Sequence, residues 1–141
     1  QYDPTGLLAG RTPEERATVN QWLSWQISGL GPYQGQLLSF LLFHQDAHGE
    51  KSGEGVIARY QQEVERLRGV LENQLASAAS GGYIALGRLT IVDFAILLWL
   101  KSSVLAREAL RKREMYPAIT GYLERLEGLE VVREAYRRAA P

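Results

Sequence analysis

The residues whose types and spacing could do chemistry are few, and the first is an acid at the start of an apolar run. Asp93 follows Thr90 by three residues and precedes the apolar residues 94–100. Such an acid could serve catalysis or bind a metal. The same spacing also forms a capping box, in which the threonine hydroxyl and the carboxylate each accept from the other residue's amide. We therefore predict that Thr90 and Asp93 are a structural cap at the start of a buried helix.

A pair of histidines is the second candidate. His44 and His48 lie four residues apart, and on a helix this spacing could bring both rings to one metal ion. Residues 44–55 are polar and contain glycines, however, so we predict a loop there. A loop of this kind gives metal ligands no rigid supporting hydrogen bonds. We expect no metal site.

A basic cluster lies in the polar stretch 101–114, which we expect to form a helix end and a connection. Its cations are Arg107, Arg111, Lys112 and Arg113. Glu108 and Glu114 interleave with them, and mixed charges are typical of a solvated face. We therefore prefer a solvated surface to an anion site.

The composition narrows the possible partners. The 141 residues contain 16 lysines and arginines and 16 aspartates and glutamates, so no net charge attracts nucleic acid or an anionic membrane. The absence of cysteine excludes disulfides, thiolate metal sites and cysteine nucleophiles within this chain. No apolar run reaches the roughly 18 residues that cross a bilayer, and no signal peptide opens the chain. We expect a cytoplasmic protein that binds neither nucleic acid nor membrane.

The sequence predicts a first helix that glycines interrupt. Thr12 precedes Pro13 and Glu15 in a second capping box, and proline suits the first helical position because its missing amide would be unpaired there. Glycines and a proline at residues 29–32 should break or kink this helix before an apolar pattern resumes at residues 33–43. The inner face should consist of Val19, Trp22, Leu23, Gln26 and Ile27.

Two glycines at this kink leave two interpretations open. Gly29 and Gly31 could simply allow neighbouring helices to pack closely. They could instead form the floor of a pocket. The residues alone do not decide between these roles.

Further helices are predicted from apolar residues at three- and four-residue spacing. A long amphipathic helix should bury Ile57, Tyr60, Val64, Leu67, Leu71 and Leu75. A helix that begins at Pro117 should bury Ile119, Tyr122, Leu123 and Leu126. A last short helix should bury Val131, Val132, Ala135 and Tyr136. We predict an all-α bundle of five or six helices around residues 91–100, with residues 1–10 as a linker and 11–141 as one domain.

Four segments carry a family resemblance when they are taken in order. They are residues 20–32 (NQWLSWQISGLGP), 56–60 (VIARY), 87–93 (GRLTIVD) and 116–119 (YPAI). Together they resemble the C-terminal helical domain of a cytosolic glutathione S-transferase. Within that superfamily they are most similar to the bacterial nu class and to the fungal class related to the nitrogen-regulatory prion protein. The match spans residues 7–136.

The resemblance implies the second domain of a two-domain enzyme. In this family a thioredoxin-like N-terminal domain binds most of the co-substrate glutathione and supplies the residue that stabilises its thiolate. That domain is absent from this chain, so we expect no catalytic residue here and no activity from this chain alone. The family's kinked first helix forms the wall of the electrophile pocket, which assigns that role to Ser24, Ser28, Gly31, Pro32 and Tyr33.

The same resemblance assigns Arg59 and Ser24 to glutathione binding. In the nu class the arginine that matches Arg59 contacts the glutathione of the dimer. The residues alone offer a plainer alternative, since an exposed arginine can pair with Glu63 four residues on. Some family members have an aromatic residue at the position of Ser24, so the pocket here should be more open or more polar.

A homodimer is also expected. Arg16, Thr18 and Gln21 on the first helix and Arg59 on the second fall off the apolar stripes, so they are free to face a second subunit or the missing domain. We expect an enzyme that joins glutathione to an electrophile or uses it to reduce a disulfide. The alternative is a non-catalytic protein-interaction scaffold, because the same helical domain serves that purpose in translation factors and synthetase complexes.

Overall fold

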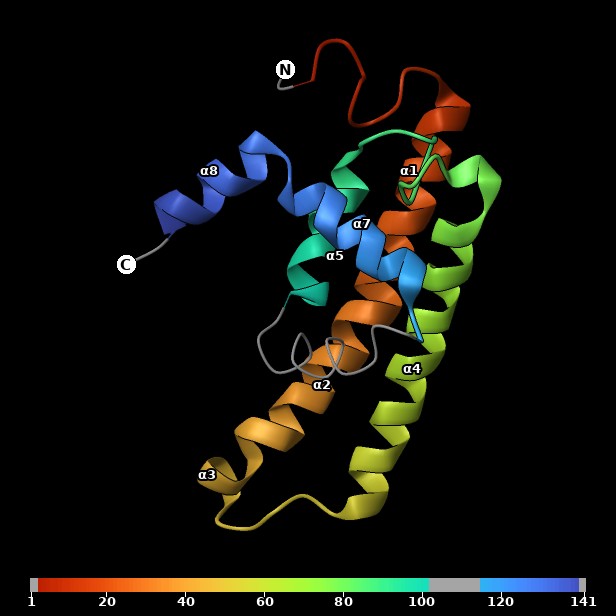
Figure 1. Cartoon of the computed structure of the whole chain (residues 1–141). Helices are drawn as coiled ribbons and strands as arrows, with labels where there is room; N and C mark the ends of the chain where they lie inside the picture. Colours follow the sequence, from red (N-terminus) through yellow and green to blue (C-terminus); the bar gives the residue numbers. More distant parts are fainter. Residues whose placement is uncertain (1–2, 102–114, 140–141) are drawn as a thin grey trace.

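The computed structural model describes residues 3–101 and 115–139 (Figure 1). No strand occurs among these residues, which confirms the all-α prediction. The predicted basic cluster, Arg107, Arg111, Lys112 and Arg113, lies outside the described part of the chain. The elements are α1 (Pro13–Trp25), the π-helical turn η1 (Gln26–Leu30), α2 (Gly31–Leu42), α3 (His44–His48), α4 (Glu54–Ala76), the 3-10 turn η2 (Ala78–Ser80), α5 (Ile91–Leu100), α7 (Pro117–Glu127) and α8 (Glu130–Ala139).

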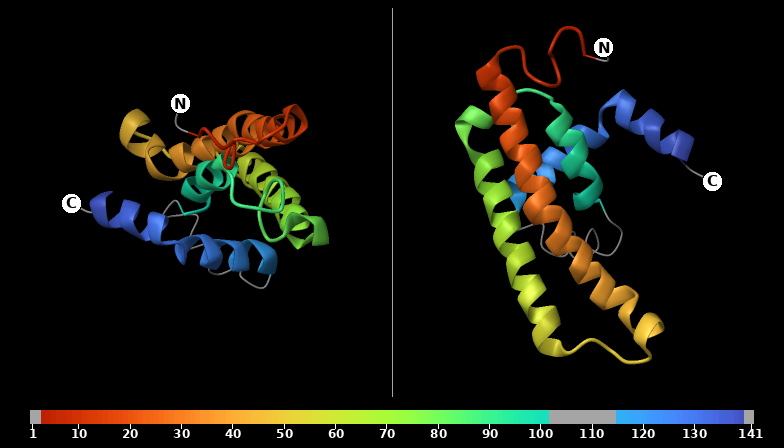
Figure 2. Two further views of the ribbon diagram at one scale, coloured as in Figure 1. Left: turned by 90° about the horizontal axis from the view of Figure 1, so that it is seen from above. Right: turned by 180° about the vertical axis from the view of Figure 1, so that it is seen from behind.

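The helices α1 and α2 form one long rod, and α4 runs antiparallel beside it (Figure 1). Seen from above, α5 lies in the middle, with the rod on one side, α4 on another and α7 on a third (Figure 2). This arrangement confirms the central position predicted for residues 91–100. None of the helices in the described ranges is both long and apolar enough to cross a bilayer.

The hydrophobic core surrounds α5. Val92 and Ile96 of α5 are fully buried, and Leu71 of α4 and Leu126 of α7 pack in the same cluster with no exposed surface. The predicted apolar stripes of α4 and α7 therefore face the core. The other core residues are Val19, Leu30, Leu67, Leu75, Ile84, Ala85, Leu97, Leu100, Ile119, Tyr122 and Val132.

The cap of α5 forms as predicted and extends further than its own helix. Both hydrogen bonds of the capping box between Thr90 and Asp93 are present, and the amide of Thr90 lies 2.7 Å from the carboxylate. The same fully buried carboxylate accepts from the amide of Ile84 and the hydroxyl of Tyr122, each at 3.1 Å. Asp93 therefore joins the preceding loop, α5 and α7.

The start of α1 has only half of the predicted capping box. The hydroxyl of Thr12 accepts from the amide of Glu15 at 3.2 Å. The carboxylate of Glu15 turns instead to the amide of Arg11 at 2.7 Å and to the guanidinium of Arg88 at 2.8 Å. The reciprocal bond is thus replaced by a link between α1 and the loop that precedes α5.

The interruption of the first helix is a π-helical turn rather than a break. In η1 the amide of Gly31 donates to the carbonyl of Gln26, which is the i→i+5 pattern of a π-helix. The wider turn shifts the register of the apolar face, so Gln26 is buried whereas Ile27 is 68% exposed. The predicted inward position of Ile27 is therefore wrong.

The loop predicted over residues 44–55 is wrong in part. His44–His48 forms the short helix α3, and α4 already begins at Glu54. The two histidine rings contact each other with their centroids 4.5 Å apart and a tilt of 40°, and Phe40 contacts His44, so aromatic packing supports this short helix. Within residues 3–101 and 115–139 no three His, Asp or Glu side chains are grouped to hold a metal.

The last helix buries less than predicted. Val132 is 4% exposed, but Val131 is 59% exposed and Ala135 and Tyr136 also face solvent. The helix α8 projects away from the bundle (Figure 1). The ammonium of Lys101 lies over the ring of Tyr136, 4.2 Å from the ring centroid. Tyr136 therefore makes a surface cation–π contact instead of filling the core.

The described part of the predicted linker, residues 3–10, is hydrogen-bonded to the helical domain. The carboxylate of Asp3 accepts from the amides of Leu7, Leu8 and Ala9 at 2.9–3.0 Å, and these hydrogen bonds lower the pKa of Asp3. The carbonyl of Leu8 accepts from the amide of Ile91 at 3.2 Å. The segment thus folds back onto the start of α5.

Candidate functional site

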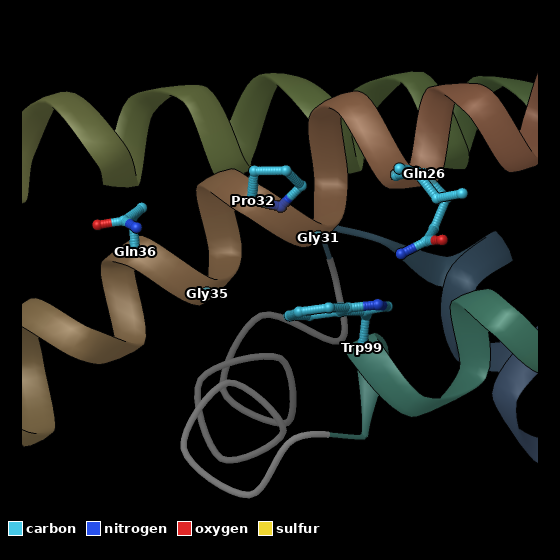
Figure 3. Close-up of a pocket in the computed structure, with 7 residues that line it drawn as sticks. Gln26, Gly31, Pro32, Gly35, Gln36 and Trp99 are labelled. Atoms are coloured by element: carbon cyan, nitrogen blue, oxygen red, sulfur yellow. The ribbon is translucent and has the colours of Figure 1, made fainter.

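A hollow of about 430 Å³ lies where η1 and α2 face the end of α5. Trp99 lies across from Gly31 and Gly35, and Gln26 and Gln36 flank it along the rod (Figure 3). The hollow is lined by Gln26, Ile27, Gly31, Pro32, Gly35, Gln36 and Trp99.

Gly31 allows the indole to approach the helix closely, and Gly35 lies beside the ring at ordinary contact distance. A β-carbon added to Gly31 would lie 3.2 Å from Cζ2 of Trp99 and 3.1 Å from Nε2 of Gln26, which is tighter than ordinary contact. A β-carbon on Gly35 would lie 3.7 Å from the Trp99 ring. Gly29 serves differently, since its β-carbon would meet Leu67 of α4 at 3.3 Å. Gly29 therefore permits helix packing, and Gly31 lines a pocket.

The chemistry of this lining is that of a binding wall. Among the described residues that line it, none carries a charge: two glutamine amides, an indole, Ile27, Pro32 and the glycines surround the space. Amides can donate to or accept from a ligand, and an indole offers a flat apolar face. The lining has no acid, base or nucleophile that could carry out a chemical step.

The structure separates the residues predicted for the electrophile pocket. Gly31 and Pro32 line the hollow, but Tyr33 points to a second hollow. Ser24 and Ser28 line neither of these two hollows. Both serines are exposed, and the hydroxyl of Ser28 donates to the carbonyl of Ser24 at 2.7 Å, as serines within helices often do.

The second hollow, of about 370 Å³, contains the predicted glutathione-binding arginine. It is lined by Tyr33, Arg59, Gln62, Glu63 and Arg66. The guanidinium of Arg66 binds the carboxylate of Glu63 through two hydrogen bonds of 2.7 and 2.9 Å, and this pairing lowers the pKa of Glu63. The plainer alternative for Arg59, an ion pair with Glu63, is not what the structure shows.

Arg59 is left available by this pairing. Within the described ranges no ion pair involves Arg59, and the residue is exposed. Its guanidinium offers a planar set of donors that can bind a carboxylate through two hydrogen bonds. The lining of the second hollow is therefore polar and charged, in contrast to the uncharged first hollow.

Several lining residues were missed by the sequence reasoning. Gly35 follows Gly31 by four residues, a spacing that places both on one side of a helix and could have marked the pocket. Trp99 gave no such signal, because in an apolar run an aromatic residue indicates core. Gln26 was expected only as part of the inner face, and Gln36 was not singled out.

The comparison with known families decides the identity of this fold. The model for "Glutathione S-transferase, C-terminal domain" matches residues 32–130. The chain belongs to this family. The predicted family resemblance is confirmed.

One curated relative is the disulfide-bond oxidoreductase YfcG of Escherichia coli. It is 31% identical to this domain over 137 residues, which is 97% of the chain and 59% of YfcG. The chain thus spans about three fifths of this relative.

Two solved structures from Phanerochaete chrysosporium share the fold of the domain. Glutathione transferase URE2P6, solved with oxidized glutathione, is 28% identical with a TM-score of 0.78 over 97% of this chain and 60% of that one. Ure2p5, cocrystallized with 1-(S-glutathionyl)-2,4-dinitrobenzene, is 27% identical with a TM-score of 0.79 over 97% of this chain and 61% of that one. These relatives belong to the fungal class expected from the sequence.

Proposed function

We propose that this domain is the helical part of a glutathione transferase-type enzyme that joins glutathione to an electrophile or uses glutathione to reduce a disulfide. The hollow beneath Trp99 is the wall of its electrophile pocket. The observation that carries this proposal is the uncharged, partly aromatic lining on the kinked rod, at Gly31 and Pro32. The relative solved with oxidized glutathione supports glutathione as the co-substrate, and the relative cocrystallized with 1-(S-glutathionyl)-2,4-dinitrobenzene supports an electrophile of this class.

Glutathione is proposed to meet this domain at the second hollow. Glutathione is anionic, and Arg59 has the donors to bind one of its carboxylates while Arg66 keeps Glu63 neutralised. The residues present therefore fit an anionic co-substrate. Ser24, although exposed and outside both hollows, remains a proposed contact from α1.

The contribution of this domain to the reaction is positioning. The family's thiolate-stabilising residue belongs to a thioredoxin-like domain. Among the described residues that line the two hollows, the one carboxylate is Glu63, and it is paired with Arg66. Holding the electrophile against the indole wall and the co-substrate at Arg59 would bring the reactants together. Such positioning can lower a barrier by several kcal/mol.

The dimer belongs to the same proposal. Arg16, Gln21 and Arg59 are exposed, and Thr18 is half-buried with its hydroxyl donating to the carbonyl of Glu14. A two-fold interface over these residues would use the same surface on both subunits. It would place Arg59 and the second hollow beside the interface, so that the dimer shares its glutathione sites.

Activity with and without the thioredoxin-like domain tests the proposal. We expect the 141-residue chain to fold and to show no conjugation of glutathione to 1-chloro-2,4-dinitrobenzene. The protein that also contains a thioredoxin-like domain should catalyse conjugation or glutathione-dependent disulfide reduction. A folded two-domain protein that does neither would contradict the enzyme and favour the scaffold, and activity of the isolated chain would contradict the division of roles.

A further inference from the structure

Gln34 is a buried polar residue directly beside the first hollow. Gly31, Gln34 and Gly35 follow the i, i+3, i+4 spacing, so they share one side of α2. The side chain of Gln34 has no exposed surface, and its amide nitrogen donates to the carbonyl of Trp99. One strip of α2 therefore holds both the backbone and the ring of Trp99.

The bond is made in the last turn of α5. The helix ends at Leu100, and the amide of Lys101 donates to the carbonyl of Leu97. Carbonyls in the last turn of a helix have no amide of their own helix to accept from. Gln34 supplies a donor to one of them, and so fixes the end of α5 against α2.

Fixing the backbone at Trp99 also fixes the indole. The ring lies in a slot against Gly31, where an added β-carbon would come within 3.2 Å of it, and it lies at ordinary contact distance from Gly35. If the backbone of Trp99 moved, the ring would leave this slot or close the hollow. The shape of the hollow thus depends on a hydrogen bond made by a residue that does not line it.

We propose that Gln34 is the positioning residue of the electrophile wall. This inference rests on the proposed function of the hollow. It predicts an effect that falls on one substrate: the electrophile contacts the wall under Trp99, whereas Arg59 and the second hollow lie on a different part of the surface. Loss of the Gln34 bond should therefore change electrophile binding and leave glutathione binding as it is.

The test replaces Gln34 with methionine, which has a similar length and no donor. The matched control is Gln74→Met in α4, because Nε2 of Gln74 makes the same kind of bond, 2.8 Å to the carbonyl of Ile84, away from both hollows. Each variant is made in a Trp22→Phe, Trp25→Phe background, where Trp99 is the only tryptophan of this chain. Quenching of the tryptophan fluorescence by acrylamide then reports on Trp99 alone, and the long-wavelength tryptophan bands of the near-ultraviolet circular dichroism report on the packing of its ring.

We expect Gln34→Met to increase quenching of Trp99 and weaken its circular dichroism, and Gln74→Met to leave both unchanged. In the two-domain protein the KM for the electrophile should rise about two- to ten-fold, the range that one net hydrogen bond supports, with an unchanged KM for glutathione. Gln34→Asn, one methylene shorter, should give the same changes and serves if the methionine variant does not fold.

Unchanged quenching in both Gln34 variants would overturn the positioning role, and so would equal changes in the Gln34 and Gln74 variants. The spectroscopic readout needs no catalysis. A two-domain protein without transferase activity whose Trp99 still responds to Gln34→Met would therefore contradict the proposed function and support the positioning role.

Discussion

At the residue scale, Asp93 does the most to hold the fold together. Its carboxylate is fully buried and accepts four hydrogen bonds, from the amides of Ile84 and Thr90 and from the hydroxyls of Thr90 and Tyr122. Burial raises the pKa of Asp93, and burial together with the nearby carboxylate raises the pKa of Tyr122, so the phenol keeps the proton that it donates. We interpret Asp93 as structural because its carboxylate is fully used in hydrogen bonds to these four donors.

Replacing Asp93 with alanine should lower the free energy of unfolding by about 1 to 3 kcal/mol, because a helix cap is lost and buried donors are left unpaired. Urea melts measure this change. Asp46→Ala, in the exposed helix α3, is the control and should have little effect. Equal stability of the Asp93 variant and the unsubstituted protein would rule out the capping role.

Arg59 is the residue on which the proposed glutathione contact depends. Arg59→Ala in the two-domain protein should weaken glutathione binding by about ten-fold or somewhat more, since a hydrogen bond to a charged group is worth roughly 1.5 to 3 kcal/mol. Titration calorimetry measures the dissociation constant. As a control, Arg133→Ala removes the same charge from the exposed surface of α8 and should leave the dissociation constant for glutathione unchanged. The same dissociation constant for the Arg59 variant would return Arg59 to the role of an ordinary surface arginine.

At the element scale, one ion pair connects the start of α1 with the loop before α5. The carboxylate of Glu15 accepts from the amide of Arg11 and from the guanidinium of Arg88, and these two contacts, in that order, lower the pKa of Glu15 below its usual value near 4.5. The native protein therefore binds fewer protons at this site than the unfolded chain. Its stabilisation is present above about pH 4.5 and is lost as the pH falls through the lower native pKa.

Glu15→Gln should accordingly lower the thermal midpoint at pH 7, and the difference from the unsubstituted protein should close on acidification below pH 4.5. Thermal melts followed by circular dichroism at several pH values measure it. Glu54→Gln, at the exposed start of α4, provides a control that carries no such link. If the thermal midpoints of Glu15→Gln and the unsubstituted protein differ by the same amount at pH 7 and at pH 3.5, the charge of Glu15 does not stabilise the contact between α1 and the loop before α5.

Most helices could be predicted from sequence because their signals are local. Proline and threonine caps and apolar spacing place α1, α4, α5 and α7 within a few residues. The register of Ile27 could not be predicted, because it depends on a π-helical turn that shifts the face after Gln26. The exposure of Tyr136 likewise depends on Lys101, which lies far away in the sequence.

The site was less predictable for the same reason. Gly31 and Pro32 were found through the family resemblance, and the structure places both in the hollow. Trp99 and Gln34 were missed, since their role arises from a contact between α2 and α5 across 65 residues. Local patterns identify caps and faces, but they do not show which buried side chain meets which helix end.

At the scale of the whole molecule, the two hollows are proposed to divide the work of the domain. The uncharged hollow on the kinked rod is suited to an electrophile, and the polar hollow with Arg59 is suited to an anionic co-substrate. The chain spans 59% of its curated relative YfcG, so this domain is proposed to act together with a thioredoxin-like domain. The central claim is that the hollow beneath Trp99 binds the electrophile.

The most direct test of that claim fills the hollow. Gly35→Leu in the two-domain protein places a side chain beside Trp99, whereas Gly69→Leu puts the same side chain on α4, where an added β-carbon meets nothing within 4 Å. Steady-state kinetics should show the electrophile KM raised about ten-fold or more by Gly35→Leu alone, with the glutathione KM unchanged. An electrophile KM that is the same in the Gly35 variant, the Gly69 variant and the unsubstituted protein would contradict the account.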